Sequence, residues 1–255
     1  MRGLRLPGGA IAMTVDESST AAATPAFIDV PPAFPAPPGG VDPTAGFRLA
    51  VTPTTVRQYW HYLVDQGLDR VPAPLLHGPP SAAGTGLRAT PAGTIEIDPD
   101  LGDLPATWVT WHGATAYCGW LAARLGAPCR MPSAAEWRYA AGGPAGFRWA
   151  LGNDFDRPVY APAATGPRPV GRTPANGFGL HDMTGNVFEW CQDPLTASGG
   201  ADADGLGSRV IKGGAYTVRN PESFDNATIF TADELSAVPY IGFRVLSLPA
   251  PERES

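Results

Sequence analysis

The chain has 255 residues, of which 31 are glycine and 29 are proline, and only 16% are charged, against roughly 25% in an average soluble protein. Its hydrophobic content of 44% excludes a wholly disordered chain and is enough to form a core. The net charge of −6 offers no basic surface to nucleic acid or to an anionic membrane, so we expect neither as a partner. This composition predicts a fold with many loops and few long helices.

The termini and the cysteines favour a protein of a reducing compartment. The first 13 residues carry two arginines before a weak apolar stretch that proline and glycine interrupt, which is not typical of a secretory signal. Met13 is a second candidate for the start. The sequence contains no uninterrupted run of about 18 apolar residues, so it predicts no membrane span. Cys118, Cys129 and Cys191 are an odd number without a C-x-x-C pair, so we expect neither a disulfide framework nor a zinc site, and we expect a cytoplasmic location.

The first predicted elements are short strands and one helix. Residues 1–25 are rich in alanine, serine, threonine and glycine and predict a disordered tail. Strands are expected at Phe27–Val30 and at 47–51, on either side of an extended proline-rich segment at 31–43. Thr52 followed by Pro53 predicts the start of a helix. Its apolar positions recur at helical spacing until Gly67, and they are Val56, Tyr59, Trp60 and Leu63.

Two further helices follow a plausible strand at 94–97. One begins after Thr110 and ends at Gly126, with an apolar stripe formed by Ala114, Tyr117, Cys118, Leu121 and Leu125. The next begins at Ser133, which forms a capping box with Glu136, and reaches Gly142. Beyond it, turns alternate with short apolar runs at 187–190, 209–212 and 241–246.

Five segments in order resemble the sulfatase-modifying-factor family, the domain of formylglycine-generating enzymes. The strongest is N-G-F-G-L-H-D-M-T-G-N-V-F-E-W at 176–190, which is similar to the family's N-x-x-G-L-Y-D-M-x-G-N-V-W-E-W. The segment R-M-P-S-A-A-E-W-R-Y-A at 130–140 is similar to R-L-P-T-E-A-E-W-E-Y-A. The others are F-R-L-A-V-T with its helix at 47–59, V-T-W through A-Y-C-G-W at 109–120, and K-G-G-A-Y at 212–216 closing with G-F-R at 242–244.

The resemblance implies a single loop-rich α+β domain over residues 26–248, related to the C-type lectin fold, with a frayed tail at 249–255. The family often holds structural calcium. Asn186 and Glu189 are spaced to present two oxygens across one turn of chain, so they are the expected ligands. The alternative is that both side chains only hydrogen-bond the irregular backbone. Trp111, Trp120, Trp137 and Trp190 are expected in the core.

The chain departs from the family at its catalytic centre. A formylglycine-generating enzyme uses copper held by two cysteines, both within the interval that corresponds here to 215–241, and this interval contains no cysteine. Counting back from Gly242 places Pro221 and Asn226 at the two positions. Since Cu(I) prefers thiolate or thioether ligands, we expect no copper–thiolate formylglycine chemistry. Cys118 is expected to be a small core hydrophobe.

The same interval supplies the candidate site residues, which are Tyr216, Glu222, Asp225 and Asn226, with Phe224 beside them. Its oxygen donors could bind a hard cation or a cationic substrate group, although acidic loop residues are more often only solvated. Some relatives are non-haem iron enzymes whose histidines lie on an additional domain. Here His61, His77, His112 and His181 show no ligand spacing, so an iron site would require assembly in three dimensions.

Two functions compete at this point. The first is oxidative tailoring or maturation of an amino-acid-derived or peptide substrate without copper–thiolate chemistry. The alternative is a non-catalytic ligand- or protein-binding module, with Phe224, Phe230 and Tyr240 as aromatic anchors. A pocket with convergent polar groups would favour an enzyme, and an open surface would favour binding. The oligomeric state has no sequence signal.

Overall fold

The structure is a computed structural model that describes residues 23–32, 46–69, 85–194 and 207–249. Most of the tails expected at 1–25 and 249–255, and most of the extended segment expected at 31–43, lie outside these residues.

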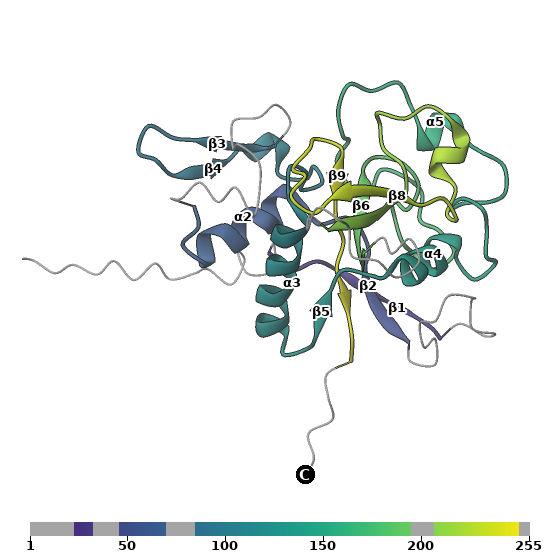
Figure 1. Cartoon of the computed structure of the whole chain (residues 1–255), viewed down its shortest axis with the longest axis horizontal. Helices are drawn as coiled ribbons and strands as arrows, with labels where there is room; N and C mark the ends of the chain where they lie inside the picture. The colour runs from purple at the N-terminus through teal and green to yellow at the C-terminus, as the bar shows by residue number, and fades with distance from the viewer. Residues whose placement is uncertain (1–22, 33–45, 70–84, 195–206, 250–255) are drawn as a thin grey trace, which may run out of the picture.

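Within these described residues, two four-stranded sheets and one hairpin form the strand framework (Figure 1). The first sheet has the order β1-β2-β10-β5, formed by β1 (Phe27–Val30), β2 (Phe47–Ala50), β10 (Leu246–Ser247) and β5 (Cys129–Arg130). The second has the order β8-β7-β6-β9, formed by β8 (Phe230–Asp233), β7 (Ser208–Lys212), β6 (Phe188–Pro194) and β9 (Ile241–Gly242). All neighbours in these sheets are antiparallel except β6 and β9. The hairpin pairs β3 (Leu87–Ala89) with β4 (Ile95–Ile97).

The predicted strands are largely confirmed, with one informative difference. Strands occur at Phe27–Val30, Phe47–Ala50 and Ile95–Ile97, close to their expected bounds. The apolar run at 241–246 does not form one strand but is divided between β9 and β10, which belong to different sheets. Between them Arg244 turns inward and is completely buried, where it binds the carboxylate of Glu189. The run is divided because its first residues pair with β6 and its last residue pairs with β2 and β5.

The first helix begins three residues later than the sequence predicts. Helix α2 (Val56–Asp65) has Thr55 as its N-cap, and not Thr52. Thr55 Oγ1 accepts from Gln58 N and Gln58 Oε1 accepts from Thr55 N, which completes a capping box. Thr54 N instead donates to Phe243 O at 2.8 Å. This long-range bond keeps the chain extended at the position where the Thr–Pro pair predicted a helix start.

The other helices form as expected. Helix α3 (Trp111–Leu125) is capped by Thr110 and ends at Gly126, whose φ of 62° is left-handed. Helix α4 (Ala134–Gly142) has the predicted capping box of Ser133 and Glu136. Three short elements complete the described chain, and they are η1 (Pro99–Leu101), α5 (Arg157–Tyr160) and η2 (Pro221–Phe224). Within the described residues, no helix has the length and apolar character that a bilayer crossing requires.

The core lies where the helices cover the sheets. One buried cluster joins α2, α3 and the strands, with the rings of Tyr59, Tyr117 and Phe243 in mutual contact. A second cluster places Trp137 of α4 against β1, β2 and β10. Trp120, Trp137 and Trp190 are buried, as expected, and Trp111 is half-buried. The second cluster fixes α4 and the loop after it, which form one wall of the pocket described next.

Candidate functional site

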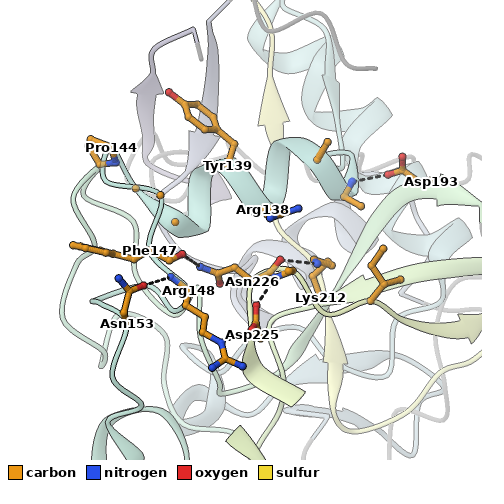
Figure 2. A pocket seen from close by; sticks show the side chains of 17 residues that line it. Arg138, Tyr139, Pro144, Phe147, Arg148, Asn153, Asp193, Lys212, Asp225 and Asn226 are labelled. Carbon is orange, nitrogen blue, oxygen red and sulfur yellow. Dashed lines mark hydrogen bonds and ion pairs between the residues drawn. The ribbon is translucent and has the colours of Figure 1, made fainter. Parts of the chain in front are cut away.

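A pocket of about 730 Å³ opens between α4, the loop that follows it and the end of β7 (Figure 2). Its volume falls within the range of roughly 300–1,000 Å³ that small-molecule sites occupy. Its walls come from the first and last turns of α4, residues 143–153, the end of β6, Lys212 and residues 225–229. Polar side chains from distant parts of the chain therefore converge on one concave surface.

Two of the expected site residues line this pocket, and a third is bound to its wall. Arg148 Nε donates to Asp225 Oδ2 at 2.5 Å, and Arg148 Nη2 pairs with Glu222. Asp225 Oδ1 accepts from Ala227 N at 2.7 Å. Burial acts to raise the pKa of Asp225, but the bonds from Arg148 and Ala227 outweigh it and lower that pKa. Asp225 is therefore an ionised, paired carboxylate in the wall, and Glu222 lies on the solvent side of Arg148.

Asn226 is the most distinctive residue of the pocket. It is 3% exposed, and its backbone N donates to Arg148 O at 2.9 Å. Its side-chain Nδ2 donates to Phe147 O at 3.0 Å. Its Oδ1 is buried and has no hydrogen-bond partner among the described residues. Since leaving a buried acceptor unsatisfied costs about 1–3 kcal/mol, this oxygen marks a place for a donor from outside the chain.

Lys212 lies directly beside Asn226, and sequence reasoning did not select it. The residue is 1% exposed, and its Nζ donates to Asn226 O at 2.8 Å and to Thr228 O at 2.6 Å. In the described part of the chain no carboxylate lies within ion-pair distance of this ammonium, and its direct contacts are the two carbonyls and the Trp137 ring, with the Asp225 carboxylate farther away. Burial lowers the pKa of Lys212 to about 8.

Arg138 and Asp193 also line the pocket and were missed. Arg138 is exposed on α4, while Asp193 Oδ2 accepts from Ala134 N at 2.6 Å, at the N-terminus of the same helix. The sequence contains only a weak signal for the pocket residues that were missed. A lysine that ends the apolar run at 209–212 is unusual inside a core, and that exception could have identified Lys212. Nothing in the local pattern distinguished Arg138 from an ordinary exposed helix residue.

Tyr216 and Phe224 are not among the residues that line the pocket. Tyr216 is half-buried, and its backbone N donates to Asn186 O at 2.9 Å. Phe224 is completely buried with Trp149, Phe155 and Tyr160 nearby. The expectation that Phe224 lines a cleft or anchors a ligand is therefore wrong, because its ring fills a small separate core. Phe230 is half-buried against Phe188.

The geometry does not support a calcium site formed by Asn186 and Glu189. Asn186 Oδ1 accepts from Arg168 N at 2.9 Å, and its Nδ2 donates to Arg168 O at 3.1 Å. The two carboxylate oxygens of Glu189 each accept from Arg244 at 2.7 Å, and one also accepts from Trp137. A cation would have to displace a buried guanidinium. Asn186 therefore follows the alternative reading, since it bonds the backbone of Arg168, whereas Glu189 bonds the side chains of Arg244 and Trp137 and not the backbone.

The histidines expected for a three-dimensional iron site are dispersed among the described residues. His61 lies on α2, His112 at the start of α3, and His181 in the loop before β6, while His77 lies outside the described residues. His181 Nδ1 lies 2.7 Å from Thr173 O, and His112 pairs with Glu234. The described ranges contain no group of three or more His, Cys, Asp or Glu residues arranged to hold a metal.

The thiols also do not fit the copper that the resemblance implies. Cys118 and Cys191 are free and buried, on α3 and β6, where burial raises the pKa of both. Cys129 is free and half-buried on β5. The lining of the pocket has no cysteine, and its Asn226 offers an amide oxygen where the family pattern has a thiolate. Thiolate chemistry is therefore not available from these residues.

A loop-rich α+β fold that carries the five motifs in order around a polar pocket defines a domain of the formylglycine-generating-enzyme class. The model of the family described as "Sulfatase-modifying factor enzyme 1-like domain" matches residues 2–248, and the chain belongs to this family. Its fold is accordingly the one that this family shares with C-type lectins.

Individual relatives agree with this assignment. The chain is 40% identical over 103 residues to the serine/threonine-protein kinase Pkn1 of Chlamydia trachomatis. The matched region is 40% of this chain and 16% of the kinase. It is 32% identical over 201 residues to the formylglycine-generating enzyme of Mycobacterium tuberculosis, covering 60% and 61% of the two chains. The solved structure of CarF is similar in fold, with a TM-score of 0.66, 22% identity, and coverage of 89% of this chain and 99% of CarF. The chain thus spans less than two thirds of the two sequence relatives.

Proposed function

We propose that this protein binds an amino-acid-derived or peptide ligand in the pocket beside Lys212 and Asn226, and that it does so without copper–thiolate chemistry. The observation that carries the proposal is the unpartnered, buried Oδ1 of Asn226 in the pocket wall. An amide oxygen at this position accepts a hydrogen bond and does not hold a soft metal ion.

The composition of the pocket supports binding over redox chemistry. Its described lining has one lysine, two arginines, two aspartates and two asparagines, but no histidine or cysteine. These groups suit recognition of a polar organic molecule, because they supply charge and hydrogen bonds from a largely preformed wall. A pocket with convergent polar groups is the geometry expected of an enzyme, whereas a described lining without histidine or cysteine favours ligand binding without redox chemistry at these residues.

Oxidative tailoring of the bound ligand is the second candidate. It is supported by family membership, and by the place of Asn226 at one of the two positions where the resemblance puts a catalytic thiolate. A metal for that chemistry would need ligands other than the described lining residues. A cytoplasmic location remains our expectation, and the three free thiols are compatible with it.

The test of binding uses saturation-transfer NMR on the full chain with a mixed library of free amino acids, acylated amino acids, short peptides and sugars. Ala227 is exposed and lines the pocket, so Ala227→Trp should fill the pocket without disturbing the core. Ala163→Trp changes an exposed residue outside the lining and is the matched control. Ligands of the pocket should lose their signal with Ala227→Trp only. A library without any such ligand would argue against the proposal.

The test of oxidation is separate. Oxygen consumption and product masses are measured for the same library, with the protein as purified and after loading with iron(II) or copper(I). Binding alone predicts no pocket-dependent oxygen consumption. A mass change in a library member that Ala227→Trp abolishes would favour oxidative tailoring, and conversion of a peptide cysteine to an aldehyde would contradict the absence of formylglycine chemistry.

A further inference from the structure

The amide of Asn226 is held in one orientation. Its Nδ2 donates to Phe147 O, and its neighbouring backbone N donates to Arg148 O. Exchanging the amide oxygen and nitrogen would place two acceptors, Oδ1 and Phe147 O, within hydrogen-bond distance of each other. The unpartnered atom is therefore the oxygen, and a molecule that completes the site must bring an N–H or O–H group to it.

The three cationic side chains that line the pocket differ in how many of their N–H donors are already bonded within the chain. Arg148 is committed to Asp225 and Glu222. Lys212 donates two of its three protons to backbone carbonyls, which leaves one donor when the amine is charged. Arg138 lines the pocket and has no ion pair or hydrogen bond with any described residue. The unused donors of Arg138 and Lys212 favour an anionic group on the ligand.

The carboxylates of the pocket do not cancel this preference. Asp225 is paired with Arg148, and Asp193 accepts from the N-terminus of α4. Because Lys212 lies beside Asn226 and has no carboxylate of the described residues within ion-pair distance, a ligand cation at Oδ1 would meet a like charge, so the group that donates to Oδ1 should be neutral. A neutral N–H next to a carboxylate is the arrangement in an acylated α-amino acid.

Two large apolar side chains are exposed in the lining of the pocket, beside the exposed Arg138, Arg148 and Asn153. Phe147 is 37% exposed and Ile229 is 53% exposed, and both line the pocket from opposite segments. They are two of the four large hydrophobic residues that are exposed in the described part of the chain. Their position at the mouth suits an apolar group on the ligand.

We propose that the pocket recognises an acylated α-amino acid with a free carboxylate and an apolar side chain. Its amide N–H donates to Asn226 Oδ1, its carboxylate faces Arg138 and Lys212, and its side chain contacts Phe147 and Ile229. The same chemistry occurs in a small N-acyl amino acid and at the C-terminal residue of a peptide. This inference rests on the proposed binding function and narrows its ligand class.

The low pKa of Lys212 provides an independent measure of whether the ligand carboxylate lies beside this amine. A carboxylate placed beside this amine would favour its charged form and raise the pKa of about 8. Ligand binding at pH 8 should therefore take up protons. This uptake appears when calorimetric heats are compared in buffers of different ionisation enthalpy.

The test is isothermal titration calorimetry of the full chain with N-acetylphenylalanine, its carboxamide, its N-methyl derivative, free phenylalanine and an acetylated hexapeptide that ends in phenylalanine. N-acetylphenylalanine or the hexapeptide should bind with proton uptake at pH 8. The carboxamide and the N-methyl derivative should each bind about tenfold more weakly or worse, since each loses one charged or buried hydrogen bond. Preference for the hexapeptide identifies a peptide C-terminus as the source, and preference for the small acid identifies a metabolite.

Two arginine variants separate recognition from folding. Arg138→Gln changes an exposed residue. It should weaken the binding of N-acetylphenylalanine about tenfold and leave the binding of its carboxamide unchanged. Arg172→Gln, also exposed but outside the lining, should leave both unchanged. Equal binding of acid and carboxamide, tighter binding of free phenylalanine, or no effect of Arg138→Gln would overturn the inference. If none of these probes binds but the NMR library yields a free amino acid or another peptide as a pocket ligand, this inference fails and the proposed function stands, whereas a sugar as the only pocket ligand would contradict both.

Discussion

Glu189 and Arg244 form a completely buried ion pair in which Nε and Nη2 of the arginine donate to the two carboxylate oxygens, each at 2.7 Å. Arg244 also donates to the carbonyls of Ala50 and His181. The pair therefore ties together β2, the loop before β6, β6 itself and the segment between β9 and β10. It links the motif at 176–190 to the G-F-R segment at 242–244, which are more than fifty residues apart.

Removing one partner of this pair should be costly. Glu189→Gln leaves a buried guanidinium without its counter-charge, and we expect it to lower the free energy of unfolding by about 3–5 kcal/mol, measured by urea denaturation. Glu96→Gln removes the partner of Arg88 in an exposed pair and should cost less than about 1 kcal/mol. Similar losses for the two variants would show that the buried pair is not a special constraint.

Gly185 should not tolerate a side chain. Its φ is +90°, and a Cβ at this position would lie 2.1 Å from Tyr160 O, so Gly185→Ala combines backbone strain with a clash against backbone. We expect insoluble or largely unfolded protein by circular dichroism. Gly93→Ala has a similar φ of +78° but open space, so it should cost only about 1–2 kcal/mol. A stable, native-like Gly185→Ala protein would contradict this local geometry.

The buried amine of Lys212 should give a measurable pH dependence. Its pKa is about 8 in the fold against 10.5 in the unfolded chain, so between these values the unfolded state binds more protons. The penalty for burying the charge is fully present below pH 8 and is relieved as the pH rises. The difference corresponds to at most about 3 kcal/mol by pH 10.5.

The measurement is the free energy of unfolding at several pH values from 7 to 9.5, for the wild type and for Lys212→Met. Subtracting the variant removes the opposing effect of the cysteines, whose raised pKa values favour unfolding above about pH 9. Asp225, Arg138 and Cys191 are the charged or titratable neighbours of Lys212, and both proteins retain them. A difference that stays flat or falls between pH 8 and 9.5 would show that Lys212 keeps an ordinary pKa.

The three thiols should react unequally with iodoacetamide. Burial raises the pKa of Cys118 and Cys191 and excludes the reagent, so neither should be alkylated in the native protein at pH 8. Cys129 is half-buried and should react slowly. Peptide mass spectrometry after native and denatured labelling gives the site of each modification. Rapid native labelling of Cys118 or Cys191, or its protection by copper(I), would revive a thiolate site.

The sequence alone identified the family, the α+β fold class and the absence of the catalytic thiols. It also predicted helices α3 and α4, because the capping signals of Thr110 and Ser133 act within a few residues of chain. Asp225 and Asn226 were selected because the family pattern places the site in their interval, and both line the pocket.

What only the tertiary structure decided depends on partners distant in sequence. The start of α2 after Thr55 follows from the bond between Thr54 and Phe243, and the division of the run at 241–246 follows from the pairing of its first residues with β6 and of its last residue with β2 and β5. The roles of Lys212 and Arg138 depend on which loops close over them, and a local pattern of residues carries no information about such contacts. A side-chain oxygen or nitrogen forms a structural hydrogen bond only when the fold brings a partner within about 3 Å of it. The fold brings Arg244 to the carboxylate of Glu189, but it brings no donor of the described residues to Asn226 Oδ1.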